Sequence, residues 1–240
     1  MVSAEEVAHM TNRCALLTQL TAMERQVVVK NGRWRQLDVG EFFFHQGEPA
    51  TLMYLIARGR VKLTQLTPDG TQVILNYFGP GEGLGIIIAL SNMAYPLSAE
   101  VVELCTCLYW EKETMRQLML QYPQLALNGL DMVAHRFAQL QERYREVATQ
   151  RVEQRVARTV LRLVTQFGKQ VANGILIDMA LTREDLAQMT GTNLYNVSRI
   201  LSKWEQQGLI SSERKHIVLC QPHQIVLIAE DLPFVKAALP

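Results

Sequence analysis

Polar side chains around residue 195 carry the most specific chemistry in the chain. An Arg can donate two parallel hydrogen bonds to O6 and N7 of guanine, and an Asn can pair with N6 and N7 of adenine. Hydroxyl and cationic side chains suit phosphate oxygens. The candidate DNA contacts of these kinds are Asn193, Tyr195, Asn196, Ser198, Arg199, Lys203, Arg214 and Lys215.

The segment LTREDLAQMTGTNLYNVSRILSKWEQQGLI predicts the elements that must position them. Thr182 and Asp185 fit a capping box, so a short helix begins there, and Gly191 permits a sharp turn. A second helix is expected over about 193–207, ending at Gly208. Its polar side chains are left on the outer surface, because its apolar positions face inward. These apolar positions are Val197, Ile200, Leu201 and Trp204. This is a helix-turn-helix pattern, and the alternative is an αα-hairpin with a solvated polar face.

Apolar runs on either side of SSERKH follow the second helix. They predict a hairpin wing, whose Arg214 and Lys215 could reach DNA phosphates.

Residues 123–150 predict one long helix with an apolar seam. The seam residues are spaced 3-4-3-4-3: Leu130, Val133, Phe137, Leu140, Tyr144 and Val147. Arg136 and Glu146 are among the polar residues expected on its other faces. The stripe either lies on its own domain's core or pairs with a second copy, and its length favours the two-fold partner. A further helix should end at Gly168, which leaves 149–151 as a candidate hinge.

Residues 33–110 predict β-structure. Short β-branched or aromatic runs alternate with turn signals about every ten residues, which is typical of a β-sandwich, roll or barrel. The five runs cover 34–39, 51–57, 60–66, 71–78 and 105–110. The turn at 67–70 is the clearest hairpin signal, and Gly59 is expected to separate the second run from the third.

Composition limits the remaining possibilities. The chain has 240 residues, 48% of them apolar, and a net charge of +1, which excludes global disorder. Residues 1–120 hold 10 basic and 12 acidic side chains, whereas residues 121–240 hold 14 and 11, so the positive charge collects in the second half. We expect no membrane span and no secretory signal, and the four scattered Cys suit the cytoplasm.

The chain resembles the cyclic-AMP receptor protein/FNR family of transcription regulators. The resemblance covers FFFHQGEPATLMYLIARGRVKLTQLTPDGTQVIL, the long helix, and the helix-turn-helix with its wing. It implies an α+β fold with a cyclic-nucleotide-binding-type β-roll (jelly roll) over 1–122, a dimerisation helix and hinge over 123–150, and a winged helix-turn-helix over 151–240. The implied partners are double-stranded DNA, a second copy of the chain and RNA polymerase.

The resemblance also assigns roles at the helix-turn-helix. Arg199 falls where the family places its principal guanine-reading Arg, and Ser198 matches the FNR-like Ser before it. Thr182 and Arg183 fall where relatives contact phosphate. Because Tyr195 stands where most relatives carry a base-reading Glu, we expect a different operator.

The resemblance disfavours cyclic AMP as the effector. Cyclic-nucleotide binders in the family carry a Glu for the ribose and an Arg for the phosphate, where this chain has Ile86 and either Pro96 or Leu97. A phosphate beside these apolar residues would lack its charged partner. The candidate effector pocket comprises Leu84, Gly85, Ile86, Ile87, Ile88 and Leu97. It could take an apolar or planar ligand, be filled by the protein's own side chains, or belong to a haem or redox sensor.

Metal and catalytic sites are not predicted. An FNR-type iron–sulfur cluster needs several N-terminal Cys, and only Cys14 is present. We expect Cys105 and Cys107 to point to opposite faces of a strand as small buried apolar side chains, which suits no zinc site. No catalytic motif is found, so an enzyme is disfavoured. The helix-turn-helix and wing disfavour a regulatory module that does not bind DNA. A purely architectural DNA-binding role stays open, as do the effector, the operator sequence and the choice between activation and repression.

Overall fold

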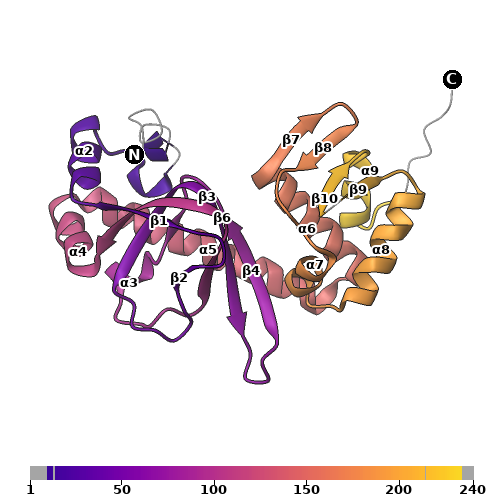
Figure 1. The fold of residues 1–240 in the computed structure, drawn as a ribbon, viewed down its shortest axis with the longest axis horizontal. Coiled ribbons are helices and arrows are strands. Elements are labelled where there is room, and N and C mark those ends of the chain that lie inside the picture. Colours follow the sequence, from indigo (N-terminus) through magenta and orange to yellow (C-terminus); the bar gives the residue numbers. More distant parts are fainter. Residues whose placement is uncertain (1–9, 13, 214, 234–240) are drawn as a thin grey trace. The chain divides into compact units, whose positions relative to one another are not determined.

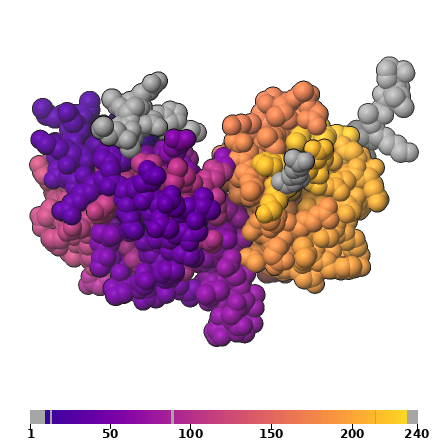
Figure 2. Space-filling view, in the orientation of Figure 1, coloured from indigo at the N-terminus to yellow at the C-terminus, as the bar shows by residue number. Residues whose placement is uncertain are grey.

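The chain folds into two compact units, residues 1–140 and 141–240. The computed structural model describes residues 10–12, 14–213 and 215–233, with residues 88 and 89 described by their backbone alone. Figure 1 shows the elements of each unit, and Figure 2 shows one face of the same residues with their side chains. Among the described residues, no helix combines the length and apolar character that a membrane span requires.

The first unit is built on a six-stranded antiparallel sheet. Its strand order is β1-β6-β3-β4, and β2 pairs with β6 while β5 pairs with β3. The strands are β1 (Arg33–Leu37), β2 (Phe42–Phe44), β3 (Leu52–Leu66), β4 (Gln72–Phe78), β5 (Gly83–Leu84) and β6 (Ser98–Glu111). The predicted hairpin at 67–70 joins β3 to β4 and projects from the body of the unit in Figures 1 and 2.

The expected break at Gly59 is wrong. Residues 51–57 and 60–66 belong to one strand, β3, which shifts register against β6 around Gly59. Gly59 has φ +89°, and a Cβ there would lie 2.3 Å from the carbonyl oxygen of Leu104. A glycine is therefore required for a bulge within the strand, where the sequence pattern indicated a turn.

Helices cover this sheet and carry the chain out of it. They are η1 (Ala15–Leu17), α2 (Ala22–Lys30), α3 (Ile87–Leu90), α4 (Lys112–Gln121) and α5 (Pro123–Thr149). Trp110 of β6 is fully buried, and its indole Nε1 donates to the carbonyl oxygen of Val28 at 2.9 Å. Leu125 and Met132 of α5 are buried in the same core, so the first half of the long helix packs on its own unit.

The two strand cysteines lie on one face of β6, so their expected placement on opposite faces is wrong. Cys105 and Cys107 pair without a bulge with Leu37 and Arg35 of β1, and residues two apart on a regular strand share a face. Both thiols are fully buried, and burial raises the pKa of each to about 12. They are buried small side chains, as expected.

The second unit combines helices with a four-stranded antiparallel sheet of order β7-β8-β10-β9. Its elements are α6 (Val152–Phe167), β7 (Gly168–Val171), β8 (Gly174–Ile177), α7 (Arg183–Thr190), α8 (Leu194–Gln206), β9 (Ile210–Glu213), β10 (His216–Leu219) and α9 (Pro222–Ala229). The predicted end of α6 at Gly168 and the predicted hairpin wing, β9–β10, are confirmed. The sequence did not reveal β7, β8 or α9. The predicted α+β fold class is confirmed.

Candidate nucleic-acid interface

Helix α7 begins at the predicted capping box. The backbone N–H of Asp185 donates to the Thr182 hydroxyl oxygen at 3.0 Å, and the N–H of Thr182 donates to the Asp185 carboxylate at 2.8 Å. The Thr182 hydroxyl itself donates to the same carboxylate at 2.6 Å. These bonds satisfy donors that a helix start leaves free, and they place a negative charge at the positive end of the helix dipole.

The turn after α7 is held by a guanidinium that the sequence did not single out. Gly191 caps the helix with φ +61°, a left-handed conformation that favours glycine. Arg155 of α6 donates from Nε to the carbonyl oxygen of Thr190 at 2.9 Å and from Nη2 to that of Gly191 at 3.3 Å. Its Nη1 donates to the carbonyl oxygen of Gln150 at 2.9 Å. One side chain thus joins the end of α5 to the turn of the helix-turn-helix.

Helix α8 buries one face and exposes the other, as predicted. Val197, Ile200, Leu201 and Trp204 are buried, and Asn193 caps the helix by accepting from the N–H of Asn196 at 2.9 Å. The side-chain amide of Asn196 donates to the hydroxyl oxygen of Thr192 at 3.1 Å. The buried face therefore fixes which side chains the helix presents outward.

Two of the predicted base-reading residues stand out on the open face. Tyr195 is 73% exposed, and Arg199, one turn later, is also exposed. Ser198 lies beside them and is half-buried. Within the described part of the chain, Arg199 forms no ion pair. Its fork of donors is available for a guanine edge.

The predicted phosphate contacts at Lys203 and Arg183 are each paired with a carboxylate. Nζ of Lys203 lies 3.0 Å from Oε1 of Glu153 and 3.2 Å from its Oε2. Nη2 of Arg183 lies 3.6 Å from Oε2 of Glu205. Neither carboxylate was singled out from the sequence, because their partners are 50 and 22 positions away.

The wing places one of its two predicted cations. Lys215 is exposed and adopts φ +71°, and its carbonyl oxygen accepts from the N–H of Leu181 at 2.7 Å. That bond ties the wing to the start of α7. Arg214 lies outside the described residues.

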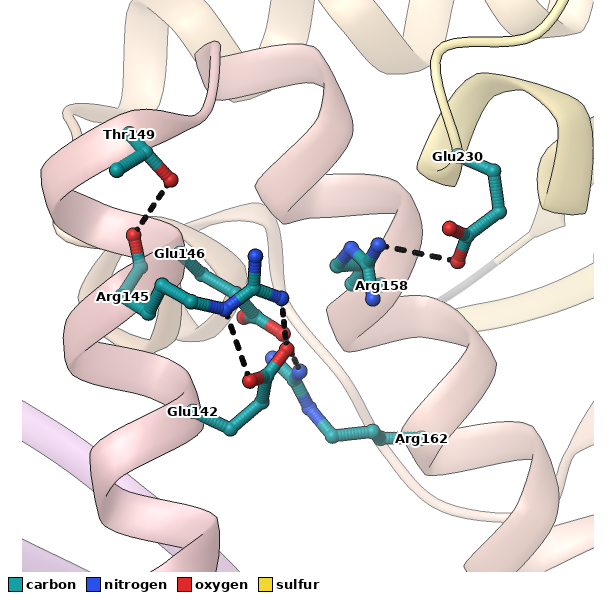
Figure 3. A network of polar contacts seen from close by, with 7 residues as sticks. All are labelled: Glu142, Arg145, Glu146, Thr149, Arg158, Arg162 and Glu230. Carbon is teal, nitrogen blue, oxygen red and sulfur yellow. Dashed lines mark hydrogen bonds and ion pairs between the residues drawn. The ribbon is translucent and has the colours of Figure 1, made fainter.

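A polar network joins the end of α5 to α6 and α9 (Figure 3). Nη1 of Arg162 lies 2.6 Å from Oε1 of Glu146, whose side chain is only 4% exposed. Glu146 was expected on a polar face, and this is wrong because α6 covers it. Burial and the neighbouring Arg162 guanidinium lower the pKa of Arg143 to about 10, against the opposing effect of Glu146. One turn earlier in α6, Nη2 of Arg158 lies 3.0 Å from Oε1 of Glu230.

Most residues of the candidate effector pocket belong to the hydrophobic core of the first unit or pack against it. Leu84 and Ile86 are buried, whereas Ile87 and Leu97 are half-buried. The side chain of Ile88 lies outside the description. Gly85 has φ +72°, and a Cβ there would lie 2.8 Å from the carbonyl oxygen of Leu52. Leu84, Ile86, Ile87 and Leu97 are therefore packed with the core.

Arg136 of α5 reaches this region, contrary to the expectation that it lies on an outer polar face. Its Nη2 donates to the carbonyl oxygen of Gly83, and its guanidinium carbon lies 4.8 Å from the centre of the Phe78 ring. Burial lowers the pKa of Arg136, and the charge of Glu82 opposes this. The pattern could not reveal this contact because it depends on the sheet beneath the helix.

The seam of α5 is open apart from one residue. Leu130, Phe137, Leu140, Tyr144 and Val147 are each more than half exposed, whereas Val133 packs against the core. Leu127, which extends the stripe by one turn, is also exposed and was missed. Among the described residues, no cluster of three or more His, Cys, Asp or Glu could hold a metal ion.

Comparison with known proteins agrees with this architecture. Residues 34–122 match the cyclic nucleotide-binding domain, and residues 154–226 match the Crp-like helix-turn-helix domain. The chain is 24% identical over 186 residues to the CRP-like cAMP-activated global transcriptional regulator of Mycobacterium tuberculosis H37Rv, covering 78% of this chain and 83% of the relative. It is 25% identical over 202 residues to the transcriptional activator protein Anr of Pseudomonas aeruginosa, covering 84% and 82%.

Solved structures show the same fold. The c-di-GMP responsive global regulator CLP of Xanthomonas campestris superposes with a TM-score of 0.73 at 20% identity, covering 83% of this chain and 99% of that one. FixK2 of Bradyrhizobium japonicum gives a TM-score of 0.71 at 23% identity, covering 86% and 99%. With both domains present in order and relatives that align over more than three quarters of the chain, the chain belongs to the CRP/FNR family of DNA-binding transcription regulators.

Proposed function

We propose that this chain regulates transcription as a homodimer that reads a two-fold DNA operator. The observation that carries the proposal is the outward face of α8. Its Tyr195 and Arg199 stand exposed while the opposite face of the helix is buried. A recognition helix enters the major groove with such a face. Arg199 reads a guanine, and Tyr195 or Asn196 reads its neighbours.

The remaining predicted contacts act on the DNA backbone. Hydroxyl or cationic groups lie before, within and after α8 in the sequence. They belong to Thr182, Arg183, Lys203 and Lys215. Contacts of this kind position a protein on the duplex and make its affinity depend on salt. We assign Arg214 to the same role from its position in the sequence, between the segments that form β9 and β10.

The open seam of α5 supports the homodimer. Its exposed apolar side chains follow a heptad spacing, and a second copy of the same helix would cover them. We accordingly assign 1–122 to a sensory domain, 123–150 to dimerisation and hinge, and 151–240 to DNA binding.

The DNA affinity is set by the state of the sensory domain and not by cyclic AMP. Ile86, which stands at the family's ribose-binding Glu, is 2% exposed. Ile86 packs closely on α5, since a Cβ built on Gly129 would lie 3.3 Å from Cδ1 of Ile86. A ligand that moves Ile86 would therefore act directly on the dimerisation helix, provided it binds one arrangement better than the other.

A family member with no small-molecule effector is the second candidate. Buried Leu84 and Ile86 and the Arg136 guanidinium beside Gly83 already fill the region with protein atoms. In that case the purified dimer binds its operator at full strength without any addition. With or without an effector, the chain acts in the cytoplasm, contacts RNA polymerase and performs no catalysis.

Selection from a pool of random DNA duplexes tests the proposal. The purified protein should enrich one sequence present as two inverted half-sites, with centres about one helical turn, roughly 10 base pairs, apart. Cyclic AMP at millimolar concentration should leave the enrichment unchanged. Enrichment of no sequence, or of an unrepeated one, would refute the two-fold operator.

A further inference from the structure

We propose that Glu153 and Glu205 compete with DNA phosphate for Lys203 and Arg183, and so lower the affinity of the protein for DNA. The inference rests on the proposed function, because it takes the two cations as phosphate contacts. Neither glutamate is among the predicted DNA contacts.

The first pair lies between α6 and α8. Both carboxylate oxygens of Glu153 lie within 3.2 Å of the Lys203 ammonium. Oε1 of Glu153 also accepts from the buried indole Nε1 of Trp204 at 3.0 Å. The neutral indole therefore holds the carboxylate in place independently of the lysine.

The second pair, between α7 and α8, repeats this arrangement. Oε2 of Glu205 lies 3.6 Å from Nη2 of Arg183. Its other oxygen, Oε1, accepts from the hydroxyl of Ser212 on the first strand of the wing. Each carboxylate is thus anchored by one neutral donor and paired with one cation.

Both cations remain open to an incoming phosphate. The side chain of Lys203 is 55% exposed and that of Arg183 is 38% exposed, so water and salt reach each pair. Ion pairs at such exposure are weak. A phosphate can therefore replace the carboxylate without unfolding any element, since the neutral donors keep both glutamates where they are.

The exchange has a cost that free cations would not carry. When phosphate takes Lys203, the carboxylate of Glu153 is left unpaired and attracts a salt cation. The uptake of this cation offsets the release of one counterion from the DNA, so the net number of ions released at that contact falls. Each pair should then weaken binding and flatten its salt dependence.

The test is the salt dependence of binding to a labelled duplex of arbitrary sequence, measured by fluorescence anisotropy from 50 to 200 mM salt. Glu153→Gln keeps an acceptor for the Trp204 indole and frees Lys203. It should raise the affinity about two- to fivefold per protomer at low salt. The slope of log K against log salt should steepen by about 0.9 per protomer. Glu205→Gln should do the same through Arg183, and the gain of Glu153→Gln should vanish in Glu153→Gln with Lys203→Gln.

Glu184→Gln is the matched control. It removes the same charge from the exposed first turn of α7, where Glu184 accepts from the neutral amide of Gln188. An equal gain in this variant would overturn the inference by showing a general charge effect. Parental affinity and slope in both Glu153→Gln and Glu205→Gln would overturn it too. So would an altered base preference on the selected operator, which would show that Glu153 orients α8. In these cases the parent still binds its operator, whereas failure of the parent to bind DNA would refute the proposed function itself.

Discussion

The carboxylate of Glu146 and the guanidinium of Arg162 lie 2.6 Å apart and fasten the last turns of α5 to α6. Arg162 also donates to the hydroxyl oxygen of Thr159 at 2.9 Å, so its guanidinium is held by two partners. Together with the Arg155 bond to Gln150, it flanks the candidate hinge at 149–151. Any pivot in that segment has to break contacts to α6.

Glu146→Ala should destabilise the second unit by about 2–3 kcal/mol, because it leaves the half-buried Arg162 guanidinium without its buried carboxylate partner. Hydrogen exchange of the α6 amides should accelerate accordingly. Glu142→Ala is the control, since Glu142 pairs with Arg145 on the same helix with both side chains about half exposed. Equal exchange in the two variants would show that the buried pair does not hold α6.

Arg155→Ala should loosen the turn of the helix-turn-helix. Three carbonyl oxygens lose a charged donor, and we expect a cost of about 2 kcal/mol together with weaker operator binding. Hydrogen exchange over residues 190–196 and anisotropy on the selected operator measure the two effects. Arg151→Ala, which removes an exposed guanidinium 3.8 Å from Asp231, serves as the control. Unchanged exchange at the turn in Arg155→Ala would count against the positioning role.

Phe137→Glu and Tyr144→Glu should each convert the dimer to a monomer. These side chains are 60% and 76% exposed on the seam, where a second helix would have to bury the new charge. Sedimentation velocity measures the change, and Gln139→Glu, on an exposed polar position of the same helix, should remain dimeric. A parental protein that sediments as a monomer would refute the dimer altogether.

The buried thiols should resist alkylation at pH 8 while Cys220 reacts. Burial raises the pKa of Cys105 and Cys107 to about 12 and that of Cys14 to about 11, from an ordinary value of 9.0. A thiol whose pKa is higher in the folded protein stabilises folding at low pH, and this contribution is lost as the pH rises from 9 toward 12. Intact mass after iodoacetamide should show one adduct in the parent and none in Cys220→Ala. Rapid modification of Cys105 or Cys107 in the native protein would be inconsistent with their burial.

The helix-turn-helix was predictable because its signals are local. A capping box at Thr182, a glycine at 191 and a period of 3.6 residues in α8 are all encoded within 30 positions. The continuation of β3 through Gly59 was not, since a glycine in a turn and a glycine in a bulge look alike in sequence.

The contacts of Arg136, Glu146 and Arg155 also escaped sequence reasoning. Each side chain sits on a helix position that reads as solvated and finds its partner on another element. The same holds for the glutamates that pair with Arg183 and Lys203. Sequence patterns indicated which residues face outward. Tertiary packing decides which of the charged side chains are paired with another element.

The proposed function depends most on the assignment of Arg199, on the open face of α8, to the reading of one operator base pair. Its most direct test is the binding free energy of the selected operator and of variants with single base-pair changes, measured with the parent and with Arg199→Ala. We predict that one G·C substitution in each half-site costs the parent about 1–3 kcal/mol and costs Arg199→Ala almost nothing. If every base-pair change costs the parent and Arg199→Ala the same binding free energy, Arg199 does not read a base pair.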